Sequence, residues 1–276
     1  MKFASYTQFF RDREERGIEY AASHAASLGF DAVEYFGRVP SDIGKTAARE
    51  REILSAYGLE VACYSVLARL FTENPKETEE KMKREIEAAA LLGSPYFHHT
   101  VFPNYTMKTV ENSFDEVLAG VVEPSEKVAK ECNRYHITCL YEPQGVYFNG
   151  IYGLDRLLSE MKLRGCEVGI CGDFGNSLFV DIDPIEIFRH FSADIRHVHV
   201  KDYRLTDIPE PNKRTYESLG GRLIYDAPLG TGVVDFREGF RLLAACGYNG
   251  TVSLELDGED EEILRSLSLV RELATI

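Results

Sequence analysis

Four residues whose side chains bind divalent cations end or interrupt short apolar runs. Glu142 follows ITCLY, Asp173 follows VGICG, His199 lies within IRHVHV and Glu255 follows TVSL. Three carboxylates and one imidazole are typical ligands of hard or borderline divalent ions. Such an ion stabilises the negative charge that forms when a proton is removed next to a carbonyl. The pattern therefore predicts metal-assisted chemistry on a carbonyl compound.

The run IRHVHVK places several polar side chains on one face of a strand. Residues two apart point to the same side, so His197, His199 and Lys201 share one face and Val198 and Val200 the other. We expect the valines to face covering helices and the polar residues to face inward. Unpaired buried charges are costly, whereas a bound cation neutralises nearby carboxylates. The alternation alone does not decide which histidine binds the ion.

Each carboxylate has an alternative interpretation. Asp173 could equally be a helix N-cap, whereas glutamate is a poor cap, which favours a functional Glu142. Glu255 has the same parity as Asp257. We prefer Glu255 because TVSL leads directly into it, while Asp257-Gly258 is typical of a turn before a helix.

Strand-like apolar runs alternate with amphipathic helices along the whole chain. The expected strands are 2–6, 32–36, 60–66, 96–100, 137–142, 168–173, 195–201 and 251–256. The expected helices are 18–28, 42–57, 75–92, 115–134, 152–163, 184–192, 235–246 and 259–273. Eight alternations without hairpins predict an α/β fold, a (β/α)8 TIM barrel in one domain over residues 1–276, with the active site at the carboxyl ends of its strands.

One segment has no clear periodicity. Residues 203–234 are expected to be a long loop after the seventh strand, starting at the barrel mouth. The segment contains four basic residues, Arg204, Lys213, Arg214 and Arg222, in an otherwise acidic chain. A solvated loop would explain its prolines and glycines. We expect a lid, because basic residues beside an acidic site could bind an anionic or hydroxyl-rich substrate and exclude water.

Composition excludes several classes of protein. A net charge of -14 disfavours nucleic-acid binding, which depends on Lys and Arg neutralising phosphates. The six cysteines include no CxxC pair, which is typical of reduced thiols in a cytosolic protein. No stretch approaches 18 apolar residues and no apolar signal core follows Met1. We therefore expect a cytoplasmic protein that binds neither nucleic acid nor membrane; whether it forms a homo-oligomer is left open.

Five motifs together resemble a known family. They are LYEP around Glu142, CGDFGNSLFVDIDP around Asp173, HVHVKDYR from His197 to Arg204, PLGTGVVDF from Pro228 to Phe236 and GYNGTVSLE from Gly247 to Glu255. The chain resembles the xylose isomerase-like barrels that include sugar phosphate isomerases/epimerases and ketose 3-epimerases.

The resemblance implies a metal site and two catalytic groups. It implies that Glu142, Asp173, His199 and Glu255 bind one divalent ion (Mn, Mg, Co or Zn), so that the second histidine of HVH is the ligand. It also implies that the two glutamates act as acid and base on opposite faces of a sugar. One departure is Asn176, where epimerases of the family carry histidine. Asparagine can hydrogen-bond a hydroxyl but cannot transfer protons near neutral pH.

The expected activity is isomerisation or epimerisation of a sugar or sugar-like carbonyl compound through an enediolate. The alternative is a lyase on the same site, a dehydratase of the inosose or dehydroshikimate type. An apurinic endonuclease-like protein, which would need further metal-binding histidines, or a non-catalytic sugar-binding protein is less favoured. Besides the two glutamates, we expect four substrate-binding residues: Asn176, His197, Lys201 and Arg204. We also expect one of His98 and His99 to face inward, and Glu34 to be buried in a hydrogen-bond network.

Overall fold

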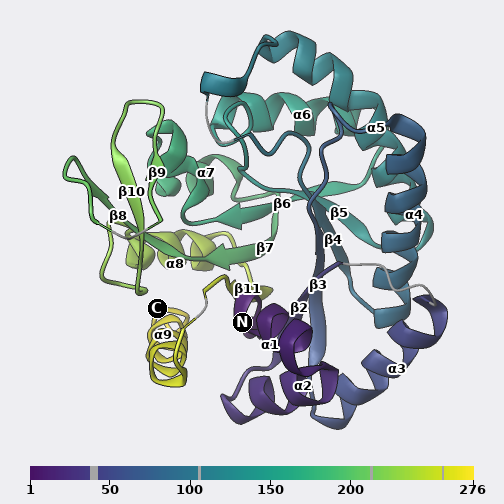
Figure 1. The fold of residues 1–276 in the computed structure, drawn as a ribbon, viewed down its shortest axis with the longest axis vertical. Helices are drawn as coiled ribbons and strands as arrows, with labels where there is room; N and C mark the ends of the chain where they lie inside the picture. The colour runs from purple at the N-terminus through teal and green to yellow at the C-terminus, as the bar shows by residue number, and fades with distance from the viewer. Residues whose placement is uncertain (38–42, 105–106, 212–213, 257) are drawn as a thin grey trace.

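Eight parallel strands close a barrel in this computed structural model, which describes residues 1–37, 43–104, 107–211, 214–256 and 258–276 (Figure 1). The strand order is β1-β11-β7-β6-β5-β4-β3-β2. The barrel strands are β1 (Lys2–Ser5), β2 (Ala32–Phe36), β3 (Glu60–Val66), β4 (Tyr96–His99), β5 (Thr138–Tyr141), β6 (Val168–Asp173), β7 (Ile195–Val200) and β11 (Thr251–Leu254). The expected (β/α)8 barrel is confirmed.

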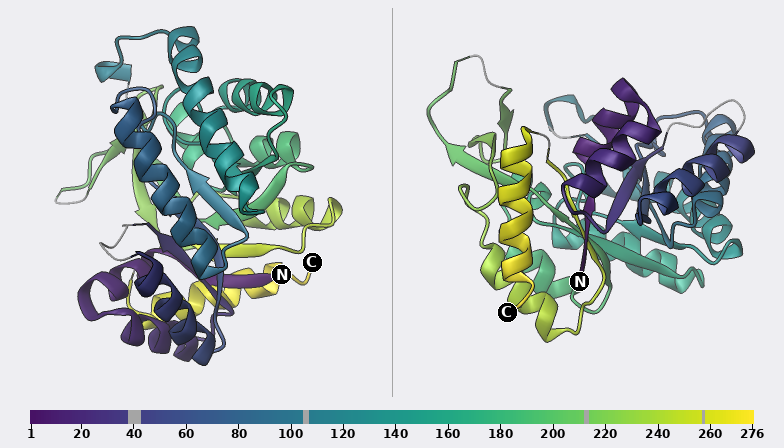
Figure 2. Two further views of the ribbon diagram at one scale, coloured as in Figure 1. Left: turned by 90° about the vertical axis from the view of Figure 1, so that its right-hand side faces the viewer. Right: turned by 90° about the horizontal axis from the view of Figure 1, so that it is seen from below.

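Helices cover the outside of this barrel (Figures 1 and 2). They are α1 (Thr7–Arg16), α2 (Ile18–Ser27), α3 (Ile43–Ala56), α4 (Pro75–Leu92), α5 (Phe114–Arg134), α6 (Ile151–Leu163), α7 (Pro184–Phe191), α8 (Phe236–Ala245) and α9 (Asp260–Leu273), with short 3-10 helices η1 (Met107–Thr109) and η2 (Asn176–Val180). Local sequence sets many of their ends. Asn74 accepts hydrogen bonds from the first turn of α4, Pro75 occupies its first position, and Gly93 ends it in the left-handed conformation.

The apolar core lies mainly between the strands and the helices, and the inside of the barrel is more polar. The buried residues of the strands include small clusters of alanine and of cysteine with leucine. The barrel strands also carry the buried polar groups Glu34, Ser65, His98, His197 and Ser253. Polar side chains that are buried inside a barrel need hydrogen-bond partners, so these residues are expected to form a hydrogen-bond network.

A β-bulge in β7 aligns the polar ends of two strands. Ile170 pairs with Ile195, but the next residue, Cys171, pairs with His197, so Arg196 is the extra residue. After this shift Asp173 lies directly opposite His199. The bulge therefore brings two of the expected metal ligands side by side.

The expectation of an irregular loop over residues 203–234 is wrong. Three short strands, β8 (Asp202–Thr206), β9 (Tyr216–Glu217) and β10 (Leu223–Ala227), form an antiparallel sheet in the order β8-β10-β9. The sheet stands to one side of the barrel (Figures 1 and 2). Tyr203 and Ile224 pack against Leu178 and Phe179 of η2. Short strands separated by prolines and glycines give too few alternations for periodicity to reveal them.

One aspartate ties the two ends of this insertion together. The Asp202 carboxylate accepts hydrogen bonds from the backbone N–H groups of Tyr203, Gly230, Gly232 and Val234, at 2.9, 3.0, 2.8 and 3.3 Å. A Cβ at Gly232 would lie 2.2 Å from an Asp202 oxygen, so only glycine permits this approach. The chain therefore leaves and re-enters the barrel mouth through one narrow neck.

Two general features bear on the environment of the protein. All six cysteines are free, and five of them are buried. Within the described ranges, none of the helices has the length and apolar character required to cross a bilayer.

Candidate metal centre and substrate cavity

Three carboxylate oxygens surround one nitrogen of His199. Its Nδ1 lies 3.2 Å from Glu142 Oε2, 3.3 Å from Glu255 Oε2 and 3.8 Å from Asp173 Oδ2. The ligand atoms of Glu142, Asp173 and His199 all lie within 4.8 Å of one another. The structure thus brings the four expected ligands together at the carboxyl ends of β5, β6, β7 and β11. The other residue considered for the fourth position, Asp257, lies outside the described residues.

The two carboxylate oxygens of Asp173 have different partners. Asp173 Oδ1 accepts hydrogen bonds from the N–H groups of Gly175 (2.8 Å) and Asn176 (2.6 Å) at the start of η2, although Gly175 and not Asp173 is the N-cap of that helix. Asp173 Oδ2 is buried and has no hydrogen-bond partner. Lys201 Nζ lies 3.2 Å from it, a contact between charges without hydrogen-bond geometry. One oxygen of this carboxylate therefore binds the backbone at the start of η2, and the other faces the site.

The other nitrogen of His199 is held by Glu34. Nε2 lies 3.0 and 3.1 Å from the two Glu34 oxygens. Glu34 also accepts a hydrogen bond from the Ser65 hydroxyl. A Glu34 oxygen lies 2.7 Å from His197 Nε2, and that nitrogen lies 3.0 Å from Ser253 Oγ. A carboxylate on one imidazole nitrogen fixes the ring and leaves the other nitrogen for a cation. The expected burial of Glu34 in a hydrogen-bond network is confirmed.

Electrostatics make His199 and Glu34 an ion pair. Burial lowers the pKa of His199, but the sulfur of Cys171 and the Glu34 carboxylate outweigh it, so the pKa lies well above its ordinary value. Burial raises the pKa of Glu34, but His199 and His197 bring it well below its ordinary value. Binding of a cation at Nδ1 would therefore require His199 to release a proton.

A lysine completes the charge balance. Lys201 Nζ donates a hydrogen bond to Glu255 Oε2 at 2.8 Å. Burial lowers the pKa of Lys201, but Asp173 and Glu255 raise it well above its ordinary value. Burial favours the neutral form of Glu255, yet Lys201 and His199 lower the pKa of that carboxyl to about 2. Burial raises the pKa of Asp173 to about 6, against the opposing effect of Lys201.

A cavity of about 470 Å³ opens beside these groups. Of the residues of the candidate site, Lys201 and Glu255 line this cavity. Tyr203, Arg214 and Tyr216 of the insertion also line it. Its size suits a small organic molecule. The expected substrate-binding role of Lys201 is compatible with this position.

The remaining expected substrate ligands differ in position. Asn176 is buried, and its side-chain Nδ2 has no hydrogen-bond partner. His197 is fully buried and its Nε2 lies 2.7 Å from Glu34, so this contact already occupies that nitrogen, and its expected substrate-binding role stays a prediction. Arg204 is directed elsewhere: it pairs with Glu210 and lies over the Tyr225 ring, 5.8 Å from its centroid. The alternation of β7 gave the correct face for His197 but not its depth.

Two further side chains lie against the candidate metal ligands. His98 is the inward member of its pair, with Nδ1 3.0 Å from Ser65 Oγ and Nε2 3.5 Å from Glu142 Oε1. Burial lowers the pKa of His98 to about 4, so its ring is neutral at pH 7. Sequence reasoning missed Tyr6, whose ring centroid lies 5.3 Å from that of His199. Its only signal in the sequence was its place at the end of the expected first strand, 2–6.

Two deeper groups also bring three potential ligands together. They are Cys171, His197 and His199, and Glu34, Cys63 and His197. Burial raises the pKa of both thiols, and a thiol binds metal only as thiolate. Glu34 and His197 are already hydrogen-bonded to each other. The carboxylate-rich group at the strand ends is therefore the better metal site.

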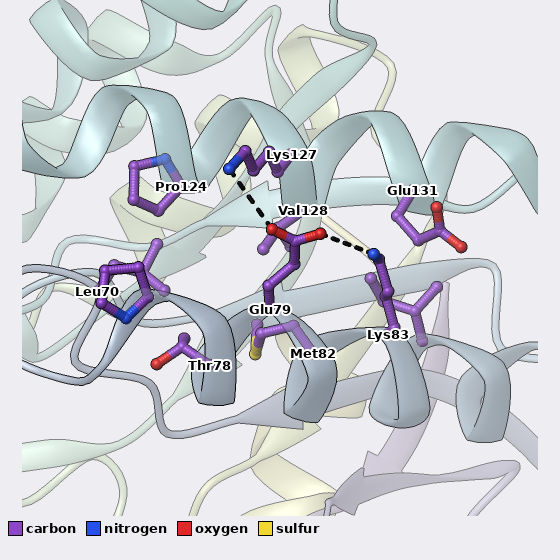
Figure 3. A pocket seen from close by; sticks show the side chains of 11 residues that line it. Leu70, Thr78, Glu79, Met82, Lys83, Pro124, Lys127, Val128 and Glu131 are labelled. Carbon is purple, nitrogen blue, oxygen red and sulfur yellow. Dashed lines mark hydrogen bonds and ion pairs between the residues drawn. The ribbon is translucent and has the colours of Figure 1, made fainter.

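A separate apolar hollow lies between α4 and α5 (Figure 3). Its volume is about 40 Å³, and the Glu79 carboxylate beside it contacts Lys83 and Lys127 at 2.6 and 3.4 Å. Helix residues line most of it, and none of the strand-end carboxylates does. We therefore place no chemistry there.

Glu34→Gln should weaken metal binding about 10- to 100-fold, because a carboxylate that orients a histidine ligand contributes on that scale. The change keeps the side-chain volume but removes the charge that fixes the His199 tautomer. Titration calorimetry with Mn²⁺ at one pH would measure it. Glu60→Gln, which alters an exposed carboxylate at the start of β3, is the control. Equal affinities in the two variants would contradict the assigned role of Glu34.

Comparison with known proteins agrees with the barrel fold. The sequence profile described as "Xylose isomerase-like TIM barrel" matches residues 22–273. An inosose dehydratase of Geobacillus thermodenitrificans (strain NG80-2) is 24% identical over 251 residues, which is 87% of this chain and 82% of that protein.

Two solved structures share the fold over nearly the whole chain. A probable 3-DHS dehydratase involved in petrobactin synthesis from Bacillus anthracis has a TM-score of 0.75 at 18% identity, covering 98% of this chain and 99% of its own. A 3-keto-D-glucoside 4-epimerase from E. coli has a TM-score of 0.71 at 20% identity, covering 99% of each chain. These two likenesses concern the fold alone.

Proposed function

This chain belongs to the family of xylose isomerase-like TIM barrels, and from that premise we propose that it is a divalent-metal-dependent enzyme that removes a proton next to the carbonyl of a polyhydroxylated ring ketone. The observation that carries the proposal is the convergence of three carboxylate oxygens on His199 Nδ1, beside a cavity of about 470 Å³. A bound divalent ion would polarise the carbonyl and stabilise the enolate charge. Glu142, Asp173, His199 and Glu255 would hold it.

In this proposal the two glutamates transfer protons on opposite sides of the substrate. Glu142 follows β5 and Glu255 follows β11, and β6 and β7 lie between these strands in the barrel. Their carboxylates therefore flank the His199 ring, 3.2 and 3.3 Å from Nδ1. Lys201 and His199 hold the pKa of Glu255 at about 2, so the group is ionised at neutral pH but is a weak base, and the proposal assigns it proton transfer by its position and not by its pKa. Glu142 is then the group on the other side of the substrate.

Neighbouring polar groups would orient the substrate. Lys201 has three N–H donors, and its hydrogen bond to Glu255 occupies one of them. The buried amide of Asn176 offers Nδ2, which has no other hydrogen-bond partner. Both can donate to substrate hydroxyl or carbonyl oxygens. Neither group needs to change its protonation state for this role.

We favour dehydration as the reaction that follows proton removal. The base takes the proton next to the carbonyl, the C–O bond of the neighbouring hydroxyl breaks, and an acid protonates the leaving oxygen, so that an unsaturated ketone and water form. The inosose dehydratase relative supports this outcome, and Asn176 lacks the acid–base capacity of the histidine found in ketose 3-epimerases. Epimerisation is the second candidate, because Glu142 and Glu255 flank the site as a pair of proton carriers would.

Incubation of the Mn²⁺-loaded protein with an inosose, a 3-oxo-glucose and a ketohexose in deuterated water should distinguish these reactions. We expect a new ultraviolet absorbance from a conjugated ketone with at least one cyclic ketone. Deuterium uptake with unchanged composition would instead support epimerisation. Absence of both with every substrate, in protein shown to hold the metal, would contradict enolate chemistry altogether.

A further inference from the structure

The Lys201 ammonium contacts the same carboxylate oxygens that a divalent ion would use. Its Nζ donates a hydrogen bond to Glu255 Oε2 at 2.8 Å and lies 3.2 Å from Asp173 Oδ2. The other oxygen of Asp173, Oδ1, already accepts two backbone N–H groups. Oδ2 is therefore the Asp173 atom that either cation must contact. The Lys201 side chain is only 10% exposed, so water screens little of its charge.

The imidazole of the candidate site faces these two oxygens as well. His199 Nδ1 lies 3.3 Å from Glu255 Oε2 and 3.8 Å from Asp173 Oδ2. An ion held by the two oxygens and by this nitrogen would therefore be a close neighbour of the Lys201 ammonium. One carboxylate oxygen can contact two cations, but two cations that are both buried repel each other far more strongly than they do in water.

The ammonium also balances charge that would otherwise be costly. The carboxylates of Glu142, Asp173 and Glu255 converge on one imidazole nitrogen. Buried like charges destabilise a protein unless an opposite charge neutralises them. Lys201 supplies this positive charge at two of the three carboxylates, and a divalent ion would supply it as well. Loss of the ammonium should therefore destabilise the protein without the ion and favour binding of the ion.

The stem of Lys201 is held in place, whereas its end has room to move. A Cβ at Gly175 would lie 2.8 Å from Lys201 Cγ and 2.5 Å from the Tyr203 ring, so a glycine is needed where the lysine stem passes. The bonds beyond Cγ can still rotate. Lys201 lines the cavity of about 470 Å³. The ammonium can therefore turn from the carboxylates into the cavity while the stem stays where it is.

We propose that Lys201 is an internal counter-ion that competes with the divalent ion. Its ammonium binds Asp173 Oδ2 and Glu255 Oε2, lowers the affinity of the site for the ion, and turns into the cavity when the ion takes these oxygens. The inference rests on the metal site of the proposed function. It adds that binding of the ion presents the ammonium to a substrate in the cavity, so one event prepares both groups.

Titration calorimetry with Mn²⁺, on protein freed of metal by a chelator and then freed of the chelator, would test this. Lys201→Met and Lys201→Gln should each bind Mn²⁺ at least tenfold more tightly than the wild type, because either change removes the competing charge. Lys201→Arg keeps the charge and should bind Mn²⁺ no more tightly than the wild type. The control is Lys162→Met, which removes an ammonium that pairs with Asp194 and is 48% exposed. Lys162→Met should bind Mn²⁺ as the wild type does.

Thermal melts separate competition from a purely structural role. Without Mn²⁺ the two neutral Lys201 variants should melt below the wild type, and saturating Mn²⁺ should remove most of this difference.

Three results would count against the inference or its premise. Mn²⁺ affinities of Lys201→Met and Lys201→Gln no higher than that of Lys162→Met would overturn the competition. Tighter binding by Lys201→Arg as well would show that the charge is not responsible, which would also overturn it. An unchanged Mn²⁺ affinity in Asp173→Ala would instead remove the metal site itself, whatever the Lys201 variants show.

Discussion

Glu255→Gln and Glu142→Gln should each lower kcat by about 10²-fold or more on the ring ketone that the wild-type protein converts. General acid–base groups contribute roughly 10²- to 10⁴-fold, and the amide keeps the shape of the side chain while it removes the proton acceptor. The rate should be measured at saturating Mn²⁺, because both carboxylates are also expected ligands. Turnover near zero at full metal occupancy would separate proton transfer from metal binding.

Glu238→Gln is the matched control for this pair. Glu238 is half-buried on α8, where its carboxylate pairs with Arg241. Glu238→Gln should leave kcat unchanged. A Glu142 or Glu255 variant that turns over as fast as the control would remove that glutamate from the list of proton carriers.

Asp173→Ala and His199→Ala should each reduce affinity for Mn²⁺ by at least one to two orders of magnitude. Loss of groups that merely orient a ligand costs about 10- to 100-fold, so loss of a ligand itself should cost no less. We expect wild-type protein to retain about one ion per chain after dialysis and both variants to lose it. Elemental analysis and titration calorimetry would measure the two quantities.

The control for metal binding is His190→Ala. This imidazole lies on the surface of α7, 3.2 Å from Asp155, and is 44% exposed. His190→Ala should retain the wild-type metal content. One ion per chain in both Asp173→Ala and His199→Ala would show that the carboxylate cluster at the strand ends is not the metal site.

The sequence predicted the barrel well because its signals are local. Apolar runs of strand length, amphipathic stretches and end signals such as Asn74, Pro75 and Gly93 are each fixed by a few neighbouring residues. The same locality failed at α1, where the charged segment TQFFRDREER nevertheless buries Gln8, Phe9 and Asp12. Its periodicity is carried by too few apolar residues to be recognised.

The residue types of the candidate site could be predicted from the sequence. The alignment of these residues with one another could not. Strand ends identified Glu142, Asp173, His199 and Glu255, but the bulge at Arg196 that aligns Asp173 with His199 leaves no local signal. The structure of the insertion, residues 203–234, was harder to predict than the candidate site. Lys213 lies outside the described residues, and whether the insertion closes over the substrate stays a prediction, although Arg214 does line the cavity as a lid residue would.

The hydrogen bonds of the Asp202 carboxylate make the insertion a segment that could be replaced without changing the barrel. It ties Tyr203 to Gly230, Gly232 and Val234, so everything between them leaves the barrel and returns at one point. The entropy of closing a loop grows only slowly with its length, so residues could be added or removed beyond the neck at little cost to the barrel. Substrate range could then diversify between related chains through this one segment, while the proton-transfer groups beneath it stay the same.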